Sequence, residues 1–474
     1  MNLEQILLMR HEMVLTVLIL LLLVIKIFDN RKDKNYSGIL YFINFLLFVV
    51  LLLGFLPNSS GTLFNNMYMT SPLNVIEKNI LTLGALLVSL QAYDWLKNHK
   101  NAIEFYMLLL ATLLGLFFMI SSGHFLMFYL GLELATIPMA ALAAFDTEKS
   151  KSGEAGIKLI LSSAFSSCIL LFGLSLIYGT TGTLNFTALA QPNIINGSPL
   201  QLLGFIFLFC GFAFEISIVP FHLWAAYVYE GSPIPITSYI SVVSKGAVIF
   251  IFISVLYTVF KNIISTWSNV LIVASVITMT IGNLFAIRQT NIKRFLAFSS
   301  ITQAGYILIG IAGSSVLGMS SVVYFILIYV FSNLGAFGVV SAVSAATGKE
   351  EIADYKGFYH TNPKLGLLIL LAIFSLAGVP PTAGFFGKLF LLTAGVGKGL
   401  YPLIIIAALN MIISLYYYLM IVKAVFIDKS EHPIEPIKSS FPAKIGLVIC
   451  SIGILAIGFL SGIFSYFYSL SFGV

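Results

Sequence analysis

The chain has 474 residues, of which 59% are hydrophobic and only 9% are charged. Soluble domains carry about 25% charged residues, so this composition excludes a soluble enzyme, a nucleic-acid-binding protein and a disordered scaffold. The 25 Lys and Arg residues outnumber the 19 Asp and Glu residues, which gives a formal charge of +6. In a membrane protein such an excess reports the orientation in the bilayer rather than an acidic partner.

Fourteen apolar runs predict transmembrane helices, because a helix needs about 20 apolar residues to cross the hydrocarbon core. The runs span residues 5–28, 39–56, 76–93, 105–121, 125–144, 156–178, 200–229, 234–260, 267–286, 295–313, 320–345, 364–393, 400–426 and 443–468. We therefore predict an all-α polytopic membrane protein. The leader before the first run is not net basic, so we expect a retained helix rather than a cleaved signal peptide.

The basic residues of the loops predict the orientation. The loops after odd-numbered runs contain 15 Lys and Arg residues, and the loops on the other side contain three. The 15 are Arg31, Lys32, Lys34, Lys97, Lys100, Lys149, Lys151, Arg288, Lys293, Arg294, Lys349, Lys356, Lys429, Lys438 and Lys444; the three are Arg10, Lys261 and Lys398. By the positive-inside rule, we expect both termini on the non-cytoplasmic side of the cell inner membrane.

Seven further basic residues lie within the predicted helices. Four are near helix ends, where we expect their ammonium groups to reach the lipid headgroups: Lys26, Lys78, Lys364 and Lys423. Six ionisable residues lie deeper: Lys158, Lys245, Lys388, Glu133, Glu215 and His222. A charge at the bilayer centre costs about 2.5–3.5 kcal/mol, so these groups must be paired, neutralised or hydrated. Two interpretations stay open, namely Glu–Lys pairs that hold helices together and a proton path of alternating acids and bases.

Two predicted helices are interrupted by proline at matching places. The run 200–229 contains Pro220, and the run 364–393 contains Pro380 and Pro381. An interior proline removes a backbone hydrogen bond, and paired interruptions in two halves of a chain are typical of inverted repeats with a site at the break. The interrupted helices are five apart, so the candidate inverted repeats are helices 4–8 and helices 9–13.

These repeats define the domain organisation that we expect. It consists of a three-helix segment, two repeats, and a C-terminal loop with the last helix: residues 1–104, 105–260, 261–426 and 427–474. Harmless kinks are the alternative, because membrane helices tolerate proline. Ionisable residues beside both breaks favour a functional site, with Glu215 and His222 at the first and Lys388 at the second.

Motifs for metals and nucleotides are missing from the sequence. Cys168, Cys210 and Cys450 are scattered and form no C-x-x-C pair, which argues against an iron–sulfur or zinc–cysteine site. No P-loop and no G-x-G-x-x-G after a strand occur. We therefore expect that this chain itself binds no cofactor and no metal.

Five stretches carry a resemblance to a known family. They are HFLMFYLGLELATIPMAAL around Glu133, GFAFEISIVPFHLWAAYVYEGSPIPITSYISVVSKGA through helices 7 and 8, NIKRFLAFSSITQAGY, FSNLGAFGVVSAVS, and SLAGVPPTAGFFGKLFLL around Lys388. Together they cover most of helices 5–13 and resemble the antiporter-like membrane subunits of bacterial NADH:quinone oxidoreductase, respiratory complex I. The chain ends soon after helix 14, which favours a member without a long lateral helix.

The resemblance implies fourteen helices with inverted repeats and a set of key residues. Glu133, Lys245 and Lys388 match the family glutamate on helix 5 and the family lysines on helices 8 and 12, and Lys158 also matches a family lysine. The family lysine of broken helix 7 is replaced by Glu215. Glu133 and Glu215 then form two carboxylates where the family pairs a glutamate with a lysine. Their negative charge is uncompensated unless Lys158 or Lys245 supplies the positive charge.

The resemblance also implies a function. We expect a proton-translocating subunit of the membrane arm without a redox centre, with NADH, FMN, iron–sulfur clusters and quinone in the partner subunits. Lys245 is the expected central proton carrier, Lys388 the onward carrier, and His222 a candidate bridge between groups. The expected partners are the other membrane-arm subunits, lipid and protons, with no nucleic acid. The alternatives are a subunit of a cation/proton antiporter or of a membrane-bound hydrogenase, and a structural subunit that does not pump.

Overall fold

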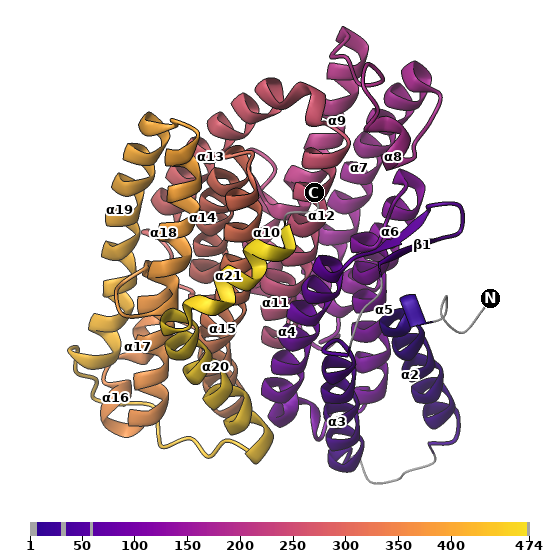
Figure 1. Ribbon diagram of the computed structural model, residues 1–474. Helices are drawn as coiled ribbons and strands as arrows, with labels where there is room; N and C mark the ends of the chain where they lie inside the picture. Colours follow the sequence, from indigo (N-terminus) through magenta and orange to yellow (C-terminus); the bar gives the residue numbers. More distant parts are fainter. Residues whose placement is uncertain (1–6, 30–34, 57–59, 472–474) are drawn as a thin grey trace.

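The N-terminal segment packs beside the first repeat. The computed structural model describes residues 7–29, 35–56 and 60–471. The segment contains α2 (Arg10–Ile27), α3 (Ser37–Leu53), the hairpin strands β1 (Gly61–Leu63) and β2 (Tyr68–Thr70), and α4 (Pro72–Leu96). The two strands are antiparallel, and the sequence had given no signal for them in the loop 57–75. Figure 1 shows this segment at one side of a bundle of tilted helices.

The two predicted repeats follow along the bundle. The first contains α5 (Ala102–Ile120), α6 (Phe125–Ala143), α7 (Ser150–Thr181), α8 (Phe186–Leu189), α9 (Pro199–Ile216), α10 (Leu223–Gly231), α11 (Ile234–Tyr239), the π-helical turn η1 (Ile240–Ser244) and α12 (Lys245–Thr258). The second contains η2 (Lys261–Ile263), α13 (Ile264–Ala286), α14 (Ile292–Ala312), α15 (Val316–Thr347), η3 (Ile352–Tyr355), α16 (Phe358–Thr361), α17 (Pro363–Ala377), α18 (Ala383–Gly397) and α19 (Tyr401–Phe426). The chain closes with α20 (Phe441–Phe459) and α21 (Ser461–Leu470).

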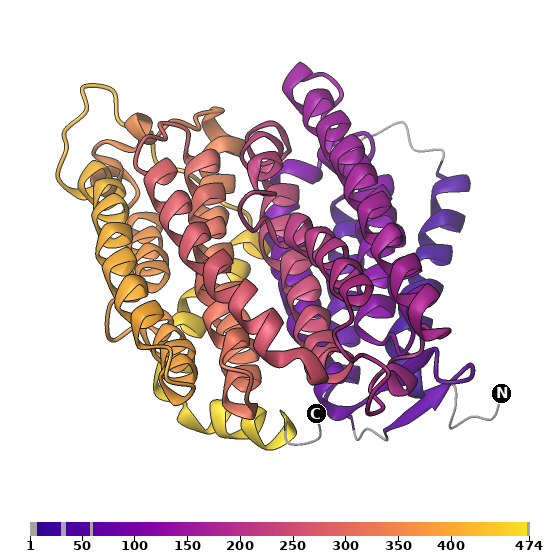
Figure 2. The same ribbon diagram turned by 90° about the horizontal axis from the view of Figure 1, so that it is seen from above.

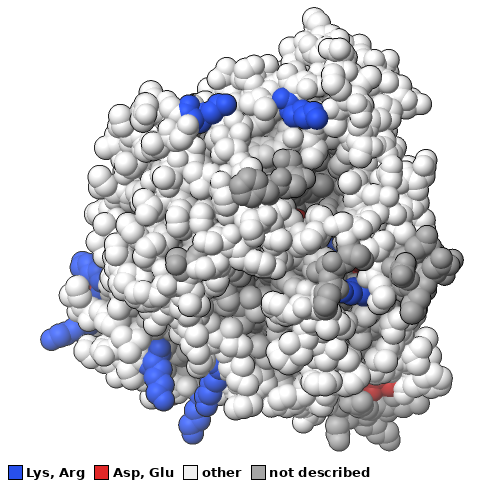
Figure 3. All heavy atoms as spheres, in the orientation of Figure 1, with Lys and Arg blue, Asp and Glu red and all other residues white. Residues whose placement is uncertain are grey.

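Every predicted apolar run coincides with one of these helices or with consecutive helices, so the all-α polytopic prediction is confirmed. Within the described residues, eleven helices are long and apolar enough to cross a membrane. Three shorter apolar helices, α3, α17 and α18, add to them. Figure 3 shows a face that is mostly without charged side chains, with most of the visible Lys and Arg side chains toward the edges of the view.

The two ends of the helices form opposite faces of the bundle. In Figure 2 the β1–β2 hairpin and α21 lie along the lower edge, whereas the loop between α19 and α20 lies at the upper edge. This arrangement fits an even number of crossings, because the last helix then ends on the face where the first one begins. The side that faces the cytoplasm stays a prediction from the basic loops.

The opening helix pairs of the two repeats cross in the same way. Gly115 on α5 and Gly131 on α6 lie at one crossing, and a Cβ atom on either would collide with the backbone of the other helix. Gly282 on α13 and Gly305 on α14 make the same close approach. Small residues let membrane helices pack backbone against backbone, and here they do so at matching places in the two repeats.

Candidate functional site

The two broken helices share one backbone geometry. α9 and α17 each end in a left-handed residue, Ser217 with φ 65° and Gly378 with φ 86°. Just beyond, an N–H group donates to the carbonyl five residues earlier, as in a Schellman motif. These bonds are Ile218 N–H to Ala213 O (2.7 Å) and Val379 N–H to Phe374 O (2.9 Å). The peptide bonds Val219–Pro220 and Pro380–Pro381 are both cis. The predicted pair of breaks is therefore confirmed.

The first break brings together the two acids that the sequence singled out. Glu215 lies buried on the last turn of α9, and Glu133 lies half-buried in the middle of α6. The two carboxylates are close enough to interact electrostatically. Oε1 of Glu133 has no hydrogen-bond partner among the described residues, and no ion pair to either carboxylate is found in that part of the chain. The site therefore contains two neighbouring acids without a paired base.

The residues after the first break satisfy the backbone but leave a histidine unpaired. The indole Nε1–H of Trp224 donates to the carbonyl of Phe214 at 2.9 Å, at the broken end of α9. His222 is buried, and neither ring nitrogen has a hydrogen-bond partner among the described residues. Its ring lies edge-on to Phe285 and interacts electrostatically with Lys245. His222 thus lies near the central lysine and has donor and acceptor capacity to spare.

Lys245 lies at the centre of the bundle, directly after the π-helical turn η1. Its side chain is 4% exposed, and its Nζ donates to Ser300 Oγ at 3.0 Å. The same Nζ is 5.3 Å from the centre of the Tyr229 ring. A cavity of about 10 Å³ beside Lys245 is also lined by Ser300, Gln303 and Tyr329, which is room for about one water molecule. Single π turns often occur at functional sites.

A polar face on α14 leads from Lys245 toward the second break. Ser300 contacts Lys245, and its neighbour Ser299 is 2.5 Å from the hydroxyl of Tyr418 on α19. Gln303 lies one turn further and donates to that hydroxyl at 3.2 Å and to Leu376 O at 3.0 Å. These hydroxyl and amide groups form a nearly continuous line inside a helix that is buried over its whole length.

Lys388 terminates this line. Its side chain is 1% exposed, and its Nζ donates to Leu376 O at 2.8 Å and to Ala377 O at 3.1 Å. The ammonium group also lies 4.8 Å from the centre of the Tyr306 ring. It therefore caps the last carbonyls of α17, where the helix dipole favours a positive charge. Lys388 and Gln303 share the carbonyl of Leu376, which joins the second break to the α14 line.

Two lysines lie elsewhere than their sequence positions suggested. Lys158, a candidate partner of Glu215, is 41% exposed and forms an ion pair with Glu154 at 2.5 Å. Its Nζ lies 4.2 Å from the centre of the Tyr227 ring, so the structure does not bring it to Glu215. The prediction for Lys78 was wrong: instead of reaching the headgroups, it is fully buried and paired with Glu12, because α2 and the hairpin cover this end of α4.

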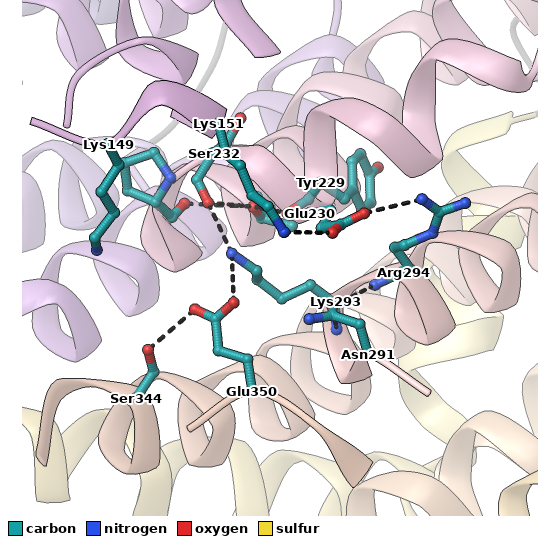
Figure 4. Close-up of polar contacts among 12 residues, drawn as sticks. Lys149, Lys151, Tyr229, Glu230, Ser232, Asn291, Lys293, Arg294, Ser344 and Glu350 are labelled. Atoms are coloured by element: carbon teal, nitrogen blue, oxygen red, sulfur yellow. Dashed lines mark hydrogen bonds and ion pairs between the residues drawn. The ribbon is translucent and has the colours of Figure 1, made fainter. Parts of the chain in front are cut away.

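A charged cleft opens above Tyr229, and the sequence reasoning missed it. It has a volume of about 380 Å³ and lies between the starts of α7, α11 and α14 and the end of α15. Lys293 Nζ is 2.9 Å from Glu350, and Glu230 accepts from Arg294 at 2.9 Å and from Lys151 at 3.0 Å (Figure 4). Lys293 also donates to Ser232 O at 3.3 Å. The cleft is thus lined by charged groups, and Glu230 on its wall directly follows Tyr229, the residue whose ring Lys245 contacts.

The sequence held part of the signal for the missed groups. Ser299, Gln303 and Tyr306 recur at intervals of four and three residues within an otherwise apolar run, which places them on one helix face. That pattern is readable from the sequence alone. Their connection to Tyr418 joins α14 to α19, and only the tertiary packing reveals it. No group of His, Cys, Asp and Glu suited to a metal ion occurs within the described residues.

Comparisons with known proteins agree with this geometry. Residues 122–414 match a family model described as NADH:quinone oxidoreductase/Mrp antiporter, TM. A chain of respiratory complex I from Thermus thermophilus superposes with a TM-score of 0.80 and 27% identity, covering 95% of this chain and 97% of that chain. A chain of the Mrp complex from Dietzia sp. DQ12-45-1b has the same fold, with a TM-score of 0.87 at 19% identity over 99% of this chain and 97% of that chain.

The chain therefore belongs to the NADH:quinone oxidoreductase/Mrp antiporter family of membrane proteins. Within this family it is similar from end to end to NADH-quinone oxidoreductase subunit N. The relative from Phocaeicola vulgatus is 48% identical over 98% of both chains. The relative from Moorella thermoacetica is 41% identical over 84% of this chain and 83% of its own length.

Proposed function

We propose that this chain is a proton-translocating membrane-arm subunit of a bacterial NADH:quinone oxidoreductase. The observation that carries the proposal is the buried polar line from Lys245 through Ser300, Gln303 and Leu376 O to Lys388. The end-to-end similarity to subunit N supports the redox-coupled complex over a stand-alone cation/proton antiporter. The partners are then the other membrane-arm subunits, in the inner membrane.

The proposed route begins at the charged cleft. Protons from the predicted cytoplasmic side enter between Glu230 and Lys293 and pass Tyr229 to reach Lys245. From Lys245 they move along the hydroxyl groups of α14 to Lys388. Glu133 and Glu215 set the negative potential at one end of this line, and His222 bridges them to Lys245 by a hydrogen bond or a water molecule.

Magnitudes allow such a carrier to work against a membrane potential. Moving one charge through 100 mV costs about 2.3 kcal/mol. A hydrogen bond to a charged group contributes about 1.5–3 kcal/mol, so making or breaking the contact between Lys245 and Ser300 supplies an energy of the same size. The chain has no redox centre of its own in this proposal, and the energy arrives from neighbouring subunits as a change of hydration or charge.

Proteoliposomes that contain the assembled complex test the proposal. Lys245→Met is expected to leave the complex assembled but to abolish most of its NADH-driven proton uptake. Lys398→Met is the matched control, since Lys398 is exposed outside the line. Equal pumping in the two variants, or purification without flavin and iron–sulfur partner proteins, would contradict the proposal.

The predicted orientation needs a separate measurement. Single cysteines in the loops 179–199 and 429–440 are expected to react with impermeant reagents from opposite sides of the membrane. The first should be labelled from the non-cytoplasmic side. Labelling of the first loop from the cytoplasm would reverse the orientation.

A further inference from the structure

A second group of buried ionisable residues lies outside both repeats, beneath the β1–β2 hairpin. It consists of His11 and Glu12 on α2, Tyr68 on β2, and Glu77 and Lys78 on α4, which we call the N-terminal cluster. All five side chains are at most 2% exposed. None of them takes part in the line from Lys245 to Lys388. A cluster of this kind in a membrane is costly and needs a reason.

The contacts of the cluster centre on Lys78. Its Nζ donates to Glu12 Oε1 at 2.5 Å and to the hydroxyl of Tyr68 at 3.1 Å. The Tyr68 hydroxyl in turn donates to the carbonyl of Leu8 at 3.1 Å. The Lys78 ammonium group also lies 5.9 Å from the centre of the Phe117 ring. One cation is therefore held between a carboxylate, a phenol and an aromatic face, with no water-exposed surface.

Within the part of the chain that the structure describes, the N-terminal cluster contains polar atoms without hydrogen-bond partners and more carboxyl groups than ammonium groups. Glu12 Oε2, Glu77 Oε1 and His11 Nε2 have no hydrogen-bond partner among the described residues. Glu12 and Glu77 are two buried carboxyl groups, and Lys78 forms an ion pair with Glu12. A second, unpaired carboxylate is strongly disfavoured in a buried site. The cluster therefore holds one further proton, with Glu77, Glu12 and His11 as the groups that can carry it. Such a shared proton belongs to the group rather than to a single residue.

The N-terminal cluster lies between the segment around Lys245, on η1 and α12, and the membrane face that carries the β1–β2 hairpin. Glu77, Leu81 and Gly84 recur at intervals of four and three residues and share one face of α4. Leu81 packs against Gly246, and Gly84 packs against Val243, on either side of the central lysine. Glu77 is one turn nearer to the hairpin than these contacts. Lys78, the next residue on α4, links this turn through its side chain to Tyr68 of the hairpin and to Glu12 on α2.

This face is the opposite of the one at which the charged cleft opens. The loops that contribute to the cleft follow odd-numbered transmembrane helices, whereas the hairpin follows the second, α3. Figure 2 shows the hairpin on the edge opposite to the loop between α19 and α20. Ser121, whose hydroxyl has no partner among the described residues, lies where the hairpin joins α5.

We propose that the N-terminal cluster is a proton-release site on the hairpin side of the membrane. The inference rests on the proposed function of the subunit and adds an outlet to it. Glu77 accepts a proton from the α12 side, and the cluster loses one proton through Glu12 or His11 to water at the hairpin. Only O–H and N–H bonds form and break, and the charge of the cluster is the same before and after.

The test compares variants in the reconstituted complex by the number of protons moved per quinone reduced. Glu77→Gln keeps the size of the side chain and removes its exchangeable proton. The double variant Glu12→Gln/Lys78→Met removes both charges together, so that neither is left unpaired. The matched control is Lys26→Met/Glu104→Gln, which removes an ion pair of 2.6 Å at the opposite end of α2, where both side chains are 36% exposed.

We expect Glu77→Gln and the double variant to assemble and to lose about one proton per quinone relative to the control. Wild-type stoichiometry in both would make the cluster a structural anchor and overturn the proposal. Failure of both to assemble, with an intact control, would have the same meaning. A normal stoichiometry in Glu77→Gln together with lost pumping in Lys388→Met would reject only the release site. Full pumping in Lys388→Met would reject the proposed function itself.

Discussion

The two broken helices have the same backbone but opposite charges. At the second break Lys388 donates to the two carbonyls that end α17, so a cation lies at the negative end of a helix dipole. At the first break the neutral Trp224 donates to Phe214 O, and Glu215 lies at the same negative end. A carboxylate there is disfavoured by the dipole and by Glu133. The second break thus has its own cation at the helix end, and we call it the self-sufficient break. The first break needs a proton or a cation from elsewhere to compensate its carboxylates, and we call it the dependent break.

The comparison teaches that a repeat conserves shape rather than chemistry. A shift of 161 residues places the hydrogen-bonded turn of the first break on that of the second, since Ile218 and Ala213 correspond to Val379 and Phe374. The same shift places Lys388 on Tyr227. Tyr227 is the ring that the exposed Lys158 covers from outside. A lysine is therefore present near the corresponding place of both breaks. Lys388 at the second break is buried, whereas Lys158 near the first break is exposed.

The largest expected effect is at the self-sufficient break. Lys388→Met keeps the length of the side chain and removes the charge, so we expect proton pumping to fall to background and coupled quinone reduction to fall with it. Assembly should survive, which blue-native electrophoresis measures. If Lys388 only locked helices together, removing it would destabilise the fold by about 3–5 kcal/mol, and the complex would be lost from the membrane.

Glu215 tests the dependent break. Glu215→Leu removes the ionisable group beside Glu133, and we expect pumping to fall roughly tenfold, or about 1.4 kcal/mol. Glu215→Lys should retain most of the pumping, because a base beside Glu133 restores a neutral pair. Proton uptake by proteoliposomes measures both. Full pumping in Glu215→Leu would remove this residue from the path.

Trp224 tests how the first break satisfies its backbone. Trp224→Phe keeps an aromatic ring but leaves the buried carbonyl of Phe214 without its donor, which costs about 1–3 kcal/mol. We expect a lower thermal unfolding temperature of the solubilised complex. Trp95→Phe is the control, because no hydrogen bond from its indole occurs within the described residues. Equal unfolding temperatures would show that another donor replaces the indole.

Lys158 should give the smallest effect. Its ion pair with Glu154 is of the i, i+4 type on an exposed helix face, and such pairs contribute about 0.3–0.5 kcal/mol. We expect Lys158→Met to pump like the unmodified complex and to unfold at nearly the same temperature. A clear loss of pumping would place Lys158 on the path and weaken the distinction between the two breaks.

The sequence predicted the parts that local patterns encode. Proline inside apolar runs located both breaks, and charge inside apolar runs located Lys245 and Lys388. Glu154 and Lys158 have the i, i+4 spacing of a helical ion pair, but the sequence analysis placed Lys158 among the deeply buried groups instead. The burial of Lys78 was not, because nearness to a helix end does not tell what covers that end. The charged cleft and the contact between Ser299 and Tyr418 join segments far apart in the sequence, and no local pattern encodes them.

The π-helical turn η1 makes the direction of Lys245 sensitive to the deletion of a residue. Such a turn contains one residue more than an α-helical turn, and Lys245 follows it directly. Because successive residues of a helix are about 100° apart, deleting one residue within Ile240–Ser244 would turn Lys245 away from Ser300 without altering any residue of the polar line. The length of the five-residue segment Ile240–Ser244 is therefore as much a part of the site as Lys245 itself. We expect this segment to tolerate a substitution far better than the loss or gain of one residue.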